Sequence, residues 1–322
     1  MRTEHFNRIM SRLDALSPAQ LDELAKAVDD RRASVASYQA IDTARGEACC
    51  RHCGSLAVVR YGRAHGLQRY RCKDCHRTSS AITGTPLSGL RMKQRFSVNT
   101  ACMGQRMTVR QTAAECGVAV STAFRWRHRF LTAIVAQQPT AVEGLLEADE
   151  TYFFLSMKGK RGLPRPARSR GGKAKKRGLS KEQVPVLVAI ARGQGYTADR
   201  VMEPGMKGKE LVEVLRSVVR PDTVVCSDGN SAYYSLQREL GVTLKMFSAS
   251  KHGCPINPSF HVQTVNSYHS RMKEWFNGRC RGVATKYLPN YVAWQRLLEW
   301  FRKGVTPNEF IASALGRQLI NT

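Results

Sequence analysis

The sequence predicts a multidomain α/β protein in which helical and cysteine-bearing modules precede a larger domain with a mixed β-sheet. Three features predict this arrangement: two cysteine pairs near residues 50 and 72, a helical stretch over about 93–138 broken at Gly117, and short apolar runs that alternate with helical stretches from about Glu143 onward. Strands followed by alternating helices and strands are typical of a three-layered α/β domain.

Composition narrows the class of protein. The 322 residues carry 51 Lys and Arg against 25 Asp and Glu, a formal net charge of +26 with an isoelectric point near 10.1. Such an excess attracts polyanions, so DNA or RNA is the expected partner. No apolar run approaches the ~18 residues that cross a bilayer, and the first residues lack the apolar stretch of a secretory signal. We therefore expect a cytoplasmic protein without a membrane partner.

Changes in pattern along the chain predict five segments. Ser17-Pro18 is a helix start signal, and Leu21, Leu24 and Val28 follow at helical spacing. The expected segments are 1–45, N-terminal helices; 46–90, a cysteine-bearing module; 91–140, a helical module; 141–305, the α/β domain with a basic insertion at 158–181; and 306–322, a C-terminal tail.

The paired cysteines predict a structural zinc ribbon within 46–90. Cys50-x-x-Cys53 and Cys72-x-x-Cys75 have the spacing of a four-thiolate site. Two such turns present four sulfurs tetrahedrally, and bound Zn²⁺ supplies the stabilisation that so short a piece lacks in core. A redox pair or a coincidence of spacing is the weaker alternative.

The helical module has helix-turn-helix spacing. Ala113 lies where two helices cross and Gly117 at the turn, so the second helix offers Ser121, Thr122 and Arg125 to a major groove. An ordinary helical hairpin uses the same apolar spacing, but the net charge favours DNA binding. The basic insertion, which contains no acidic residue, is expected to contact DNA phosphates through Lys173, Lys175, Lys176 and Arg177.

Two aspartates are the candidate catalytic carboxylates. Asp149 lies in an apolar run, and Asp228 ends a short apolar run at a Gly-Asn turn. Singly, Glu147, Asp149 and Glu150 read as polar strand positions and Asp228 as a turn residue. Together, Asp149 and Asp228 fit two carboxylates from neighbouring strands that hold Mg²⁺ or Mn²⁺ for two-metal phosphodiester chemistry.

A third group comes from a predicted helix near 265–277. Asn266 and Lys273 share one face of it at i and i+7. Asn266 offers an amide oxygen to the metal, and Lys273 reaches a phosphate as a point charge. Glu274 is the alternative third ligand. A solvent-facing polar stripe without a metal-binding role is the alternative interpretation of this helix.

With these residues in place, the chain resembles bacterial insertion-sequence transposases of the zinc-ribbon family usually numbered fifteen-ninety-five. The resemblance covers roughly 46–302 and rests on Arg69-Tyr-Arg-Cys-Lys-Asp-Cys75, Thr83-Gly-Thr-Pro-Leu87, Thr122-Ala-Phe-Arg-Trp-Arg127, Glu147-Ala-Asp-Glu-Thr-Tyr-Phe153, Ser227-Asp-Gly229, Asn266 with Lys273, and Lys286-Tyr-Leu288. It implies an RNase H-like domain of the Asp-Asp-Glu type, with Asp149 on the first strand, Asp228 on the fourth and Asn266 in place of the commoner glutamate.

The resemblance implies a DNA transposase that binds terminal inverted repeats, cleaves 3′ ends and joins them to target DNA. It would act in the bacterial nucleoid on double-stranded DNA, as a homo-oligomer in a synaptic complex, because two ends must be brought together. Two alternatives remain open: a zinc-ribbon and helix-turn-helix regulator whose α/β domain no longer cuts, and a nuclease that never joins ends.

Overall fold

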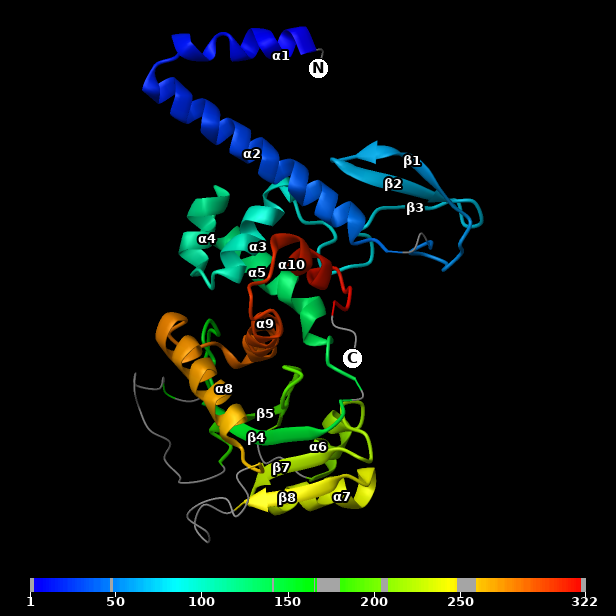
Figure 1. The fold of residues 1–322 in the computed structure, drawn as a ribbon, viewed down its shortest axis with the longest axis vertical. Coiled ribbons are helices and arrows are strands. Elements are labelled where there is room, and N and C mark those ends of the chain that lie inside the picture. The colour runs from blue at the N-terminus through cyan, green and yellow to red at the C-terminus, as the bar shows by residue number, and fades with distance from the viewer. Residues whose placement is uncertain are drawn as a thin grey trace.

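The computed structural model describes residues 3–46, 49–140, 142–164, 166, 180–203, 208–247 and 259–319 (Figure 1). Its N-terminal helices are α1 (Thr3–Met10), the short η1 (Leu13–Ala15) and α2 (Pro18–Thr43). The Ser17 side chain accepts a hydrogen bond from the Gln20 amide, while the Gln20 side chain accepts one from the Ser17 amide. This capping box, with Pro18 at the first helical position, confirms the predicted helix start.

A small antiparallel sheet follows, made of β1 (Val58–Ala64), β2 (Leu67–Cys72) and β3 (Thr78–Ser79) in that order. It packs on the end of α2 at Gly66, whose φ is +81°. A Cβ built there would lie 2.3 Å from the ring of Tyr38, so only glycine fits this approach.

The helical module contains the short η2 (Lys93–Arg95) and then α3 (Phe96–Gly104), α4 (Val109–Cys116) and α5 (Val120–Val135). The sequence predicted two helices here, and the structure has α3 in addition. Most residues of α3 are buried, including Asn99 and Thr100, so the helix lacks the one-sided apolar stripe by which a surface helix is recognised.

The α/β domain is built on a five-stranded mixed sheet, which confirms that prediction. Its order is β6-β5-β4-β7-β8, with β4 at the centre. β4 pairs antiparallel with β5 and parallel with β7; β5 with β6 is antiparallel, and β7 with β8 is parallel. The strands are β4 (Leu145–Phe154), β5 (Gln183–Ala191), β6 (Thr197–Val201), β7 (Val224–Asp228) and β8 (Thr243–Phe247).

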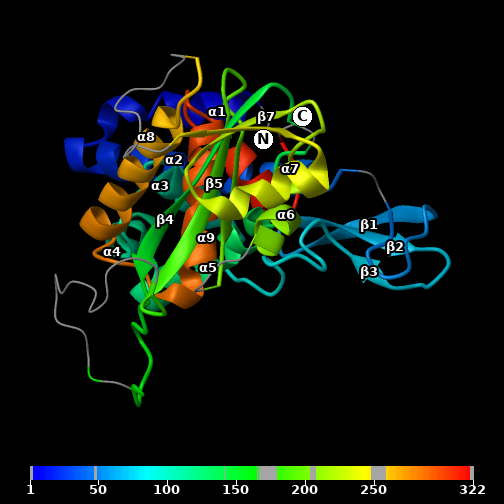
Figure 2. The same cartoon turned by 90° about the horizontal axis from the view of Figure 1, so that it is seen from below.

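Helices cover both faces of this sheet (Figure 2), which gives the expected three layers. One face packs on α6 and α7, the other on α8 and α9. The bounds are α6 (Gly208–Leu215), η3 (Ser231–Tyr233), α7 (Tyr234–Leu240), α8 (Gln263–Lys273), a π-helical segment (Glu274–Arg279), η5 (Thr285–Tyr287) and α9 (Leu288–Trp300).

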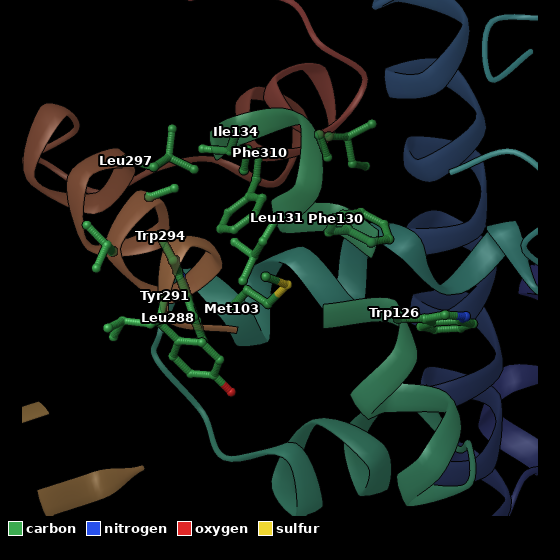
Figure 3. Close-up of a cluster of buried hydrophobic side chains, with 14 of the residues drawn as sticks. Met103, Trp126, Phe130, Leu131, Ile134, Leu288, Tyr291, Trp294, Leu297 and Phe310 are labelled. Carbon is green, nitrogen blue, oxygen red and sulfur yellow. The ribbon is translucent and has the colours of Figure 1, made fainter. Parts of the chain in front are cut away.

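One hydrophobic core joins the helical module to the α/β domain (Figure 3). Phe130 and Leu131 of α5 lie in the same buried cluster as Trp294 of α9. A tail was expected over 306–322, but the structure has α10 (Pro307–Ala314) there, with Phe310 and Ile311 fully buried. Burial against α3 and α5 stabilises this short helix, so the expectation of a tail was wrong.

In the part of the chain described, no helix is long and apolar enough to cross a membrane.

Candidate active site and metal centres

The candidate carboxylates meet where the central strand runs beside β7. Glu147 pairs with Cys226 in the parallel register of β4 and β7, and Asp149 and Asp228 each lie two residues beyond this pair. Carboxylate oxygens of Asp149, Glu150 and Asp228 all lie within 4.8 Å of one another. The structure thus brings the two predicted aspartates together and adds a third acid.

Glu150 is a site residue that the sequence reading left as a plain strand position. It is buried, accepts a hydrogen bond from the Tyr233 hydroxyl at 2.6 Å, and lies 3.5 Å from the amide nitrogen of Asn230. Burial raises the pKa of Glu150 to about 7, and the Tyr233 bond only partly offsets this. Neighbouring acids inside an apolar strand were the available signal, because carboxylates without partners are costly there.

Asp149 has only 15% of its side chain exposed. Burial, followed by repulsion from Asp228, raises the pKa of Asp149 to about 6. These crowded carboxylates fit a divalent cation as oxygen donors. The positive charge of the cation would offset both the burial of the carboxylates and the repulsion between them. Oxygen ligands favour Mg²⁺ or Mn²⁺ over softer metals.

The helix α8 faces Asp149 from the other side of the site. His269 Nδ1 lies 3.6 Å from Asp149 Oδ2, and His269 shares a helix face with Asn266 and Lys273 at i+3 and i+7 from Asn266. Burial, then Lys273, lowers the pKa of His269 to about 4, so the ring is neutral near pH 7. Lys273 partly offsets the rise in the pKa of Asp149. Sequence reasoning missed His269, because no spacing rule marks it.

The predicted third group occupies an exposed position on this helix. Asn266 is solvent-exposed and lies one turn before His269. Glu274 is also exposed and begins the π-helical segment. Among the described residues, Glu274 is not part of the carboxylate group, whereas Glu150 is.

Glu147 connects α8 to the central strand. Its side chain is fully buried and accepts hydrogen bonds from the backbone amides of Thr264 and Val265 at 2.8 and 3.1 Å. Arg192 donates to the same carboxylate at 2.6 Å. The helix that carries Asn266 is thereby fastened to the strand that carries Asp149.

The four predicted cysteines form a second candidate metal centre. Their Sγ atoms lie within 4.8 Å of one another, with Cys50 to Cys75 at 3.6 Å and Cys53 to Cys72 at 3.7 Å. A zinc tetrahedron with Zn–S of about 2.3 Å has edges of about 3.8 Å, so the four thiols fit that ion. His52, another possible ligand, has its Nε2 3.1 Å from the carbonyl of Thr78 instead.

The helix-turn-helix residues lie as predicted. Gly117, with φ +62°, ends α4, and Ala113, Ala123 and Trp126 are buried between the helices. Ser121 and Arg125 are exposed and Thr122 is half-buried at the start of α5. The four predicted basic contacts, Lys173, Lys175, Lys176 and Arg177, lie outside the described residues.

Known families match two parts of the chain. Residues 141–296 match the model of the ISXO2-like transposase domain, and residues 91–134 that of a homeodomain-like domain. A protein of the transposable element ISH50 of Halobacterium salinarum is 33% identical over 260 residues, which covers 79% of this chain and 86% of that protein.

Two solved structures are similar at low identity. The simian T-cell lymphotropic virus intasome in complex with PP2A regulatory subunit B56 gamma matches at 10% identity and a TM-score of 0.30, over 62% of this chain and 65% of that one. A pre-cleavage Mos1 transpososome matches at 12% identity and a TM-score of 0.24, over 65% and 77%.

The family matches define the class of protein: an insertion-sequence transposase. Within that class, the chain belongs to the ISXO2-like, or IS1595, family.

Proposed function

We propose that this transposase binds the terminal inverted repeats of its element, cleaves their 3′ ends and transfers them to target DNA in an RNase H-like active site. The observation that carries the proposal is the meeting of Asp149, Glu150 and Asp228 within 4.8 Å, beside α8, in a chain of net charge +26. Carboxylates so close together resist ionisation unless a cation binds them. A cation-dependent reaction on a polyanion accounts for both the carboxylate cluster and the high positive charge of the chain.

Asp149 and Asp228 would hold the divalent cations, and Asn266 would complete the set with Glu150 as a further carboxylate. Two cations held there would activate a water or 3′-hydroxyl and stabilise the leaving oxygen of a phosphodiester. Lys273, on the same helix face as Asn266, orients a phosphate beside them. Tyr233 holds Glu150 in place through its 2.6 Å hydrogen bond.

The modules before the active site would bind the ends. Ser121, Thr122 and Arg125 are offered to the major groove, and the four clustered cysteines would hold a structural Zn²⁺ that keeps the small sheet folded. The basic insertion would hold flanking or target DNA through its phosphates. Two ends require at least two copies of the chain.

One assay tests the whole proposal. Purified protein is incubated with Mg²⁺ or Mn²⁺, labelled repeat-end DNA and a target plasmid. Nicked ends together with joined product support the transposase, nicking alone supports a nuclease, and binding alone supports a regulator. Asp149→Ala and Asp228→Ala should each abolish cleavage but keep end binding. Intact cleavage in either variant contradicts the site assignment.

A further inference from the structure

The carboxylate of Glu147 joins the two elements that carry the candidate catalytic residues. It lies on β4 two residues before Asp149 and accepts the backbone amides of Thr264 and Val265. Amides in the first turn of a helix have no intrahelical partners, and a negative charge there is favoured by the helix dipole. This contact lies within one turn of Asn266, so it fixes the end of α8 from which that side chain projects.

A second set of contacts fixes the orientation of this carboxylate. Arg192 donates to it from Nε at 2.9 Å and from Nη2 at 2.6 Å, and the Thr264 hydroxyl donates at 2.8 Å. Arg192 also donates to the carbonyl of His261 at 3.2 Å, in the segment that leads into α8. Because a fully buried carboxylate is costly without partners, these bonds hold Glu147 in one place.

We propose that Glu147 is a positioning residue of the active site, which sets how closely α8 presents the Asn266 amide to the carboxylates on β4 and β7. The inference rests on the proposed function, since it takes Asn266 as a metal ligand. Replacing a residue that orients a metal ligand without touching the metal typically lowers metal affinity by about 10–100-fold.

The test is a double-mutant cycle on Mn²⁺ binding, measured by titration calorimetry with Glu147→Gln, Asn266→Ala and the double variant. Each single change should weaken binding by about tenfold. The double variant should bind no more weakly than Asn266→Ala, because both changes remove one contact. Unchanged affinity in either single variant, or losses that multiply, overturns the inference. Unchanged binding in Asp149→Ala would count against the proposed function instead.

Two further variants separate positioning from general stability. Thr264→Val removes one donor and keeps the ion pair, so it serves if Glu147→Gln does not fold; we expect a loss of about threefold, and wild-type affinity would contradict the inference. Asp42→Asn is the matched control, since Asp42 also accepts a backbone amide and a guanidinium, from Gln68 and Arg63. Its Mn²⁺ affinity should equal that of the wild type. An equal loss there would mean that Glu147 acts only through stability.

An independent observation concerns the N-terminal arm, defined as residues 3–43. α1 has no buried residue, and Figure 1 shows α1 and the first part of α2 extending away from the rest of the chain, whereas the end of α2 packs on the helical module. On α2, Leu21, Val28 and Val35 are 42%, 48% and 38% exposed and recur every seven residues. Leu24 lies in the same stripe. Leu21, Leu24, Val28 and Val35 follow the heptad spacing of a seam by which helices pair, and Arg31 interrupts it at one position.

The charge of the arm points to its partner. Residues 3–43 contain five Lys and Arg and seven Asp and Glu, a net charge of −2, in a chain whose net charge is +26. A surface of this charge does not attract DNA phosphates, so a nucleic acid is not the partner that this seam favours. Two strongly basic chains repel each other, and contact through arms of small net charge keeps that repulsion low.

From the seam and its charge we infer that α2 pairs with α2 of a second copy of this chain. The proposed function requires such an assembly, but the pairing needs no DNA. Light scattering coupled to gel filtration, without DNA, therefore tests it separately from cleavage.

The wild-type protein should elute at a multiple of 36.0 kDa, and the double variant Leu21→Ser with Val28→Ser at 36.0 kDa. Both residues are exposed, so the change should leave the fold intact. Leu56→Ser is the control, because Leu56 is 78% exposed on the cysteine-bearing module. Its mass should match that of the wild type. A single-chain mass for the wild type, or an assembled mass for the double variant, overturns the inference.

Discussion

Replacing Asp149 with asparagine should stabilise the protein when no divalent cation is present. The pKa of Asp149 is raised from 3.8 to about 6, first by burial and then by Asp228. At 1.36 kcal/mol per pH unit, ionising this carboxyl above pH 6 costs about 3 kcal/mol. Asparagine keeps the shape and removes the charge, so Asp149→Asn should gain about 1–3 kcal/mol in free energy of unfolding at pH 7.5.

The pH dependence follows from the sign of this shift. Because the pKa of Asp149 is higher in the folded than in the unfolded chain, the folded state binds more protons between about pH 4 and 6. Wild-type stability should therefore fall as the pH rises through that window. The advantage of Asp149→Asn should disappear near pH 4, where the wild-type carboxyl is protonated in the folded chain.

Urea unfolding followed by circular dichroism measures this effect. The buffer is stripped by a chelating resin, since a dissolved chelator would compete for zinc. Saturating Mn²⁺ should stabilise the wild type by about 3 kcal/mol at a hundred times its dissociation constant and leave Asp149→Asn nearly unchanged. A metal-free variant less stable than the wild type at pH 7.5, or equal stabilisation of both by Mn²⁺, would refute the reasoning.

Three more predictions follow from the sites described. Mn²⁺ affinity should fall between pH 8 and pH 5.5, because Glu150 and Asp149, with pKa values of about 7 and about 6, take up protons there; calorimetry in two buffers should detect the protons released on binding. Cys53→Ser should lower the zinc content by mass spectrometry from one ion per chain to none. Asp199→Asn should cost about 3–5 kcal/mol in urea unfolding, because it leaves the fully buried Arg296 without its carboxylate partner.

Sequence patterns predicted those parts of the fold that depend on local spacing. Ser17 marks its helix start by a side-chain hydrogen bond and Gly117 its helix end by a left-handed backbone, and both signals are local. Asp149 and Asp228 could be expected to meet, because each ends or follows an apolar run that reads as a strand. The strand β8 was not predicted, since its five residues at a sheet edge include Lys245 and give only a weak alternation.

The remaining features depend on contacts between distant segments. His269 lies beside Asp149 because α8 packs on the sheet, where Thr264 bonds to Glu147, 117 positions away in the chain. The burial of Phe310 likewise depends on α3 and α5. No window of the sequence contains both sides of these contacts.

A premature stop codon shortly before the end of the gene should disrupt the helix-turn-helix module, although that module is encoded far earlier in the chain. A chain ending at residue 305 lacks α10, with the fully buried Phe310 and Ile311, and uncovers α3 and α5. Losing each such side chain costs about 2–5 kcal/mol, against a typical total stability of about 5–15 kcal/mol. Truncated copies of the element would thus encode a protein that neither folds nor competes with intact copies for the repeats.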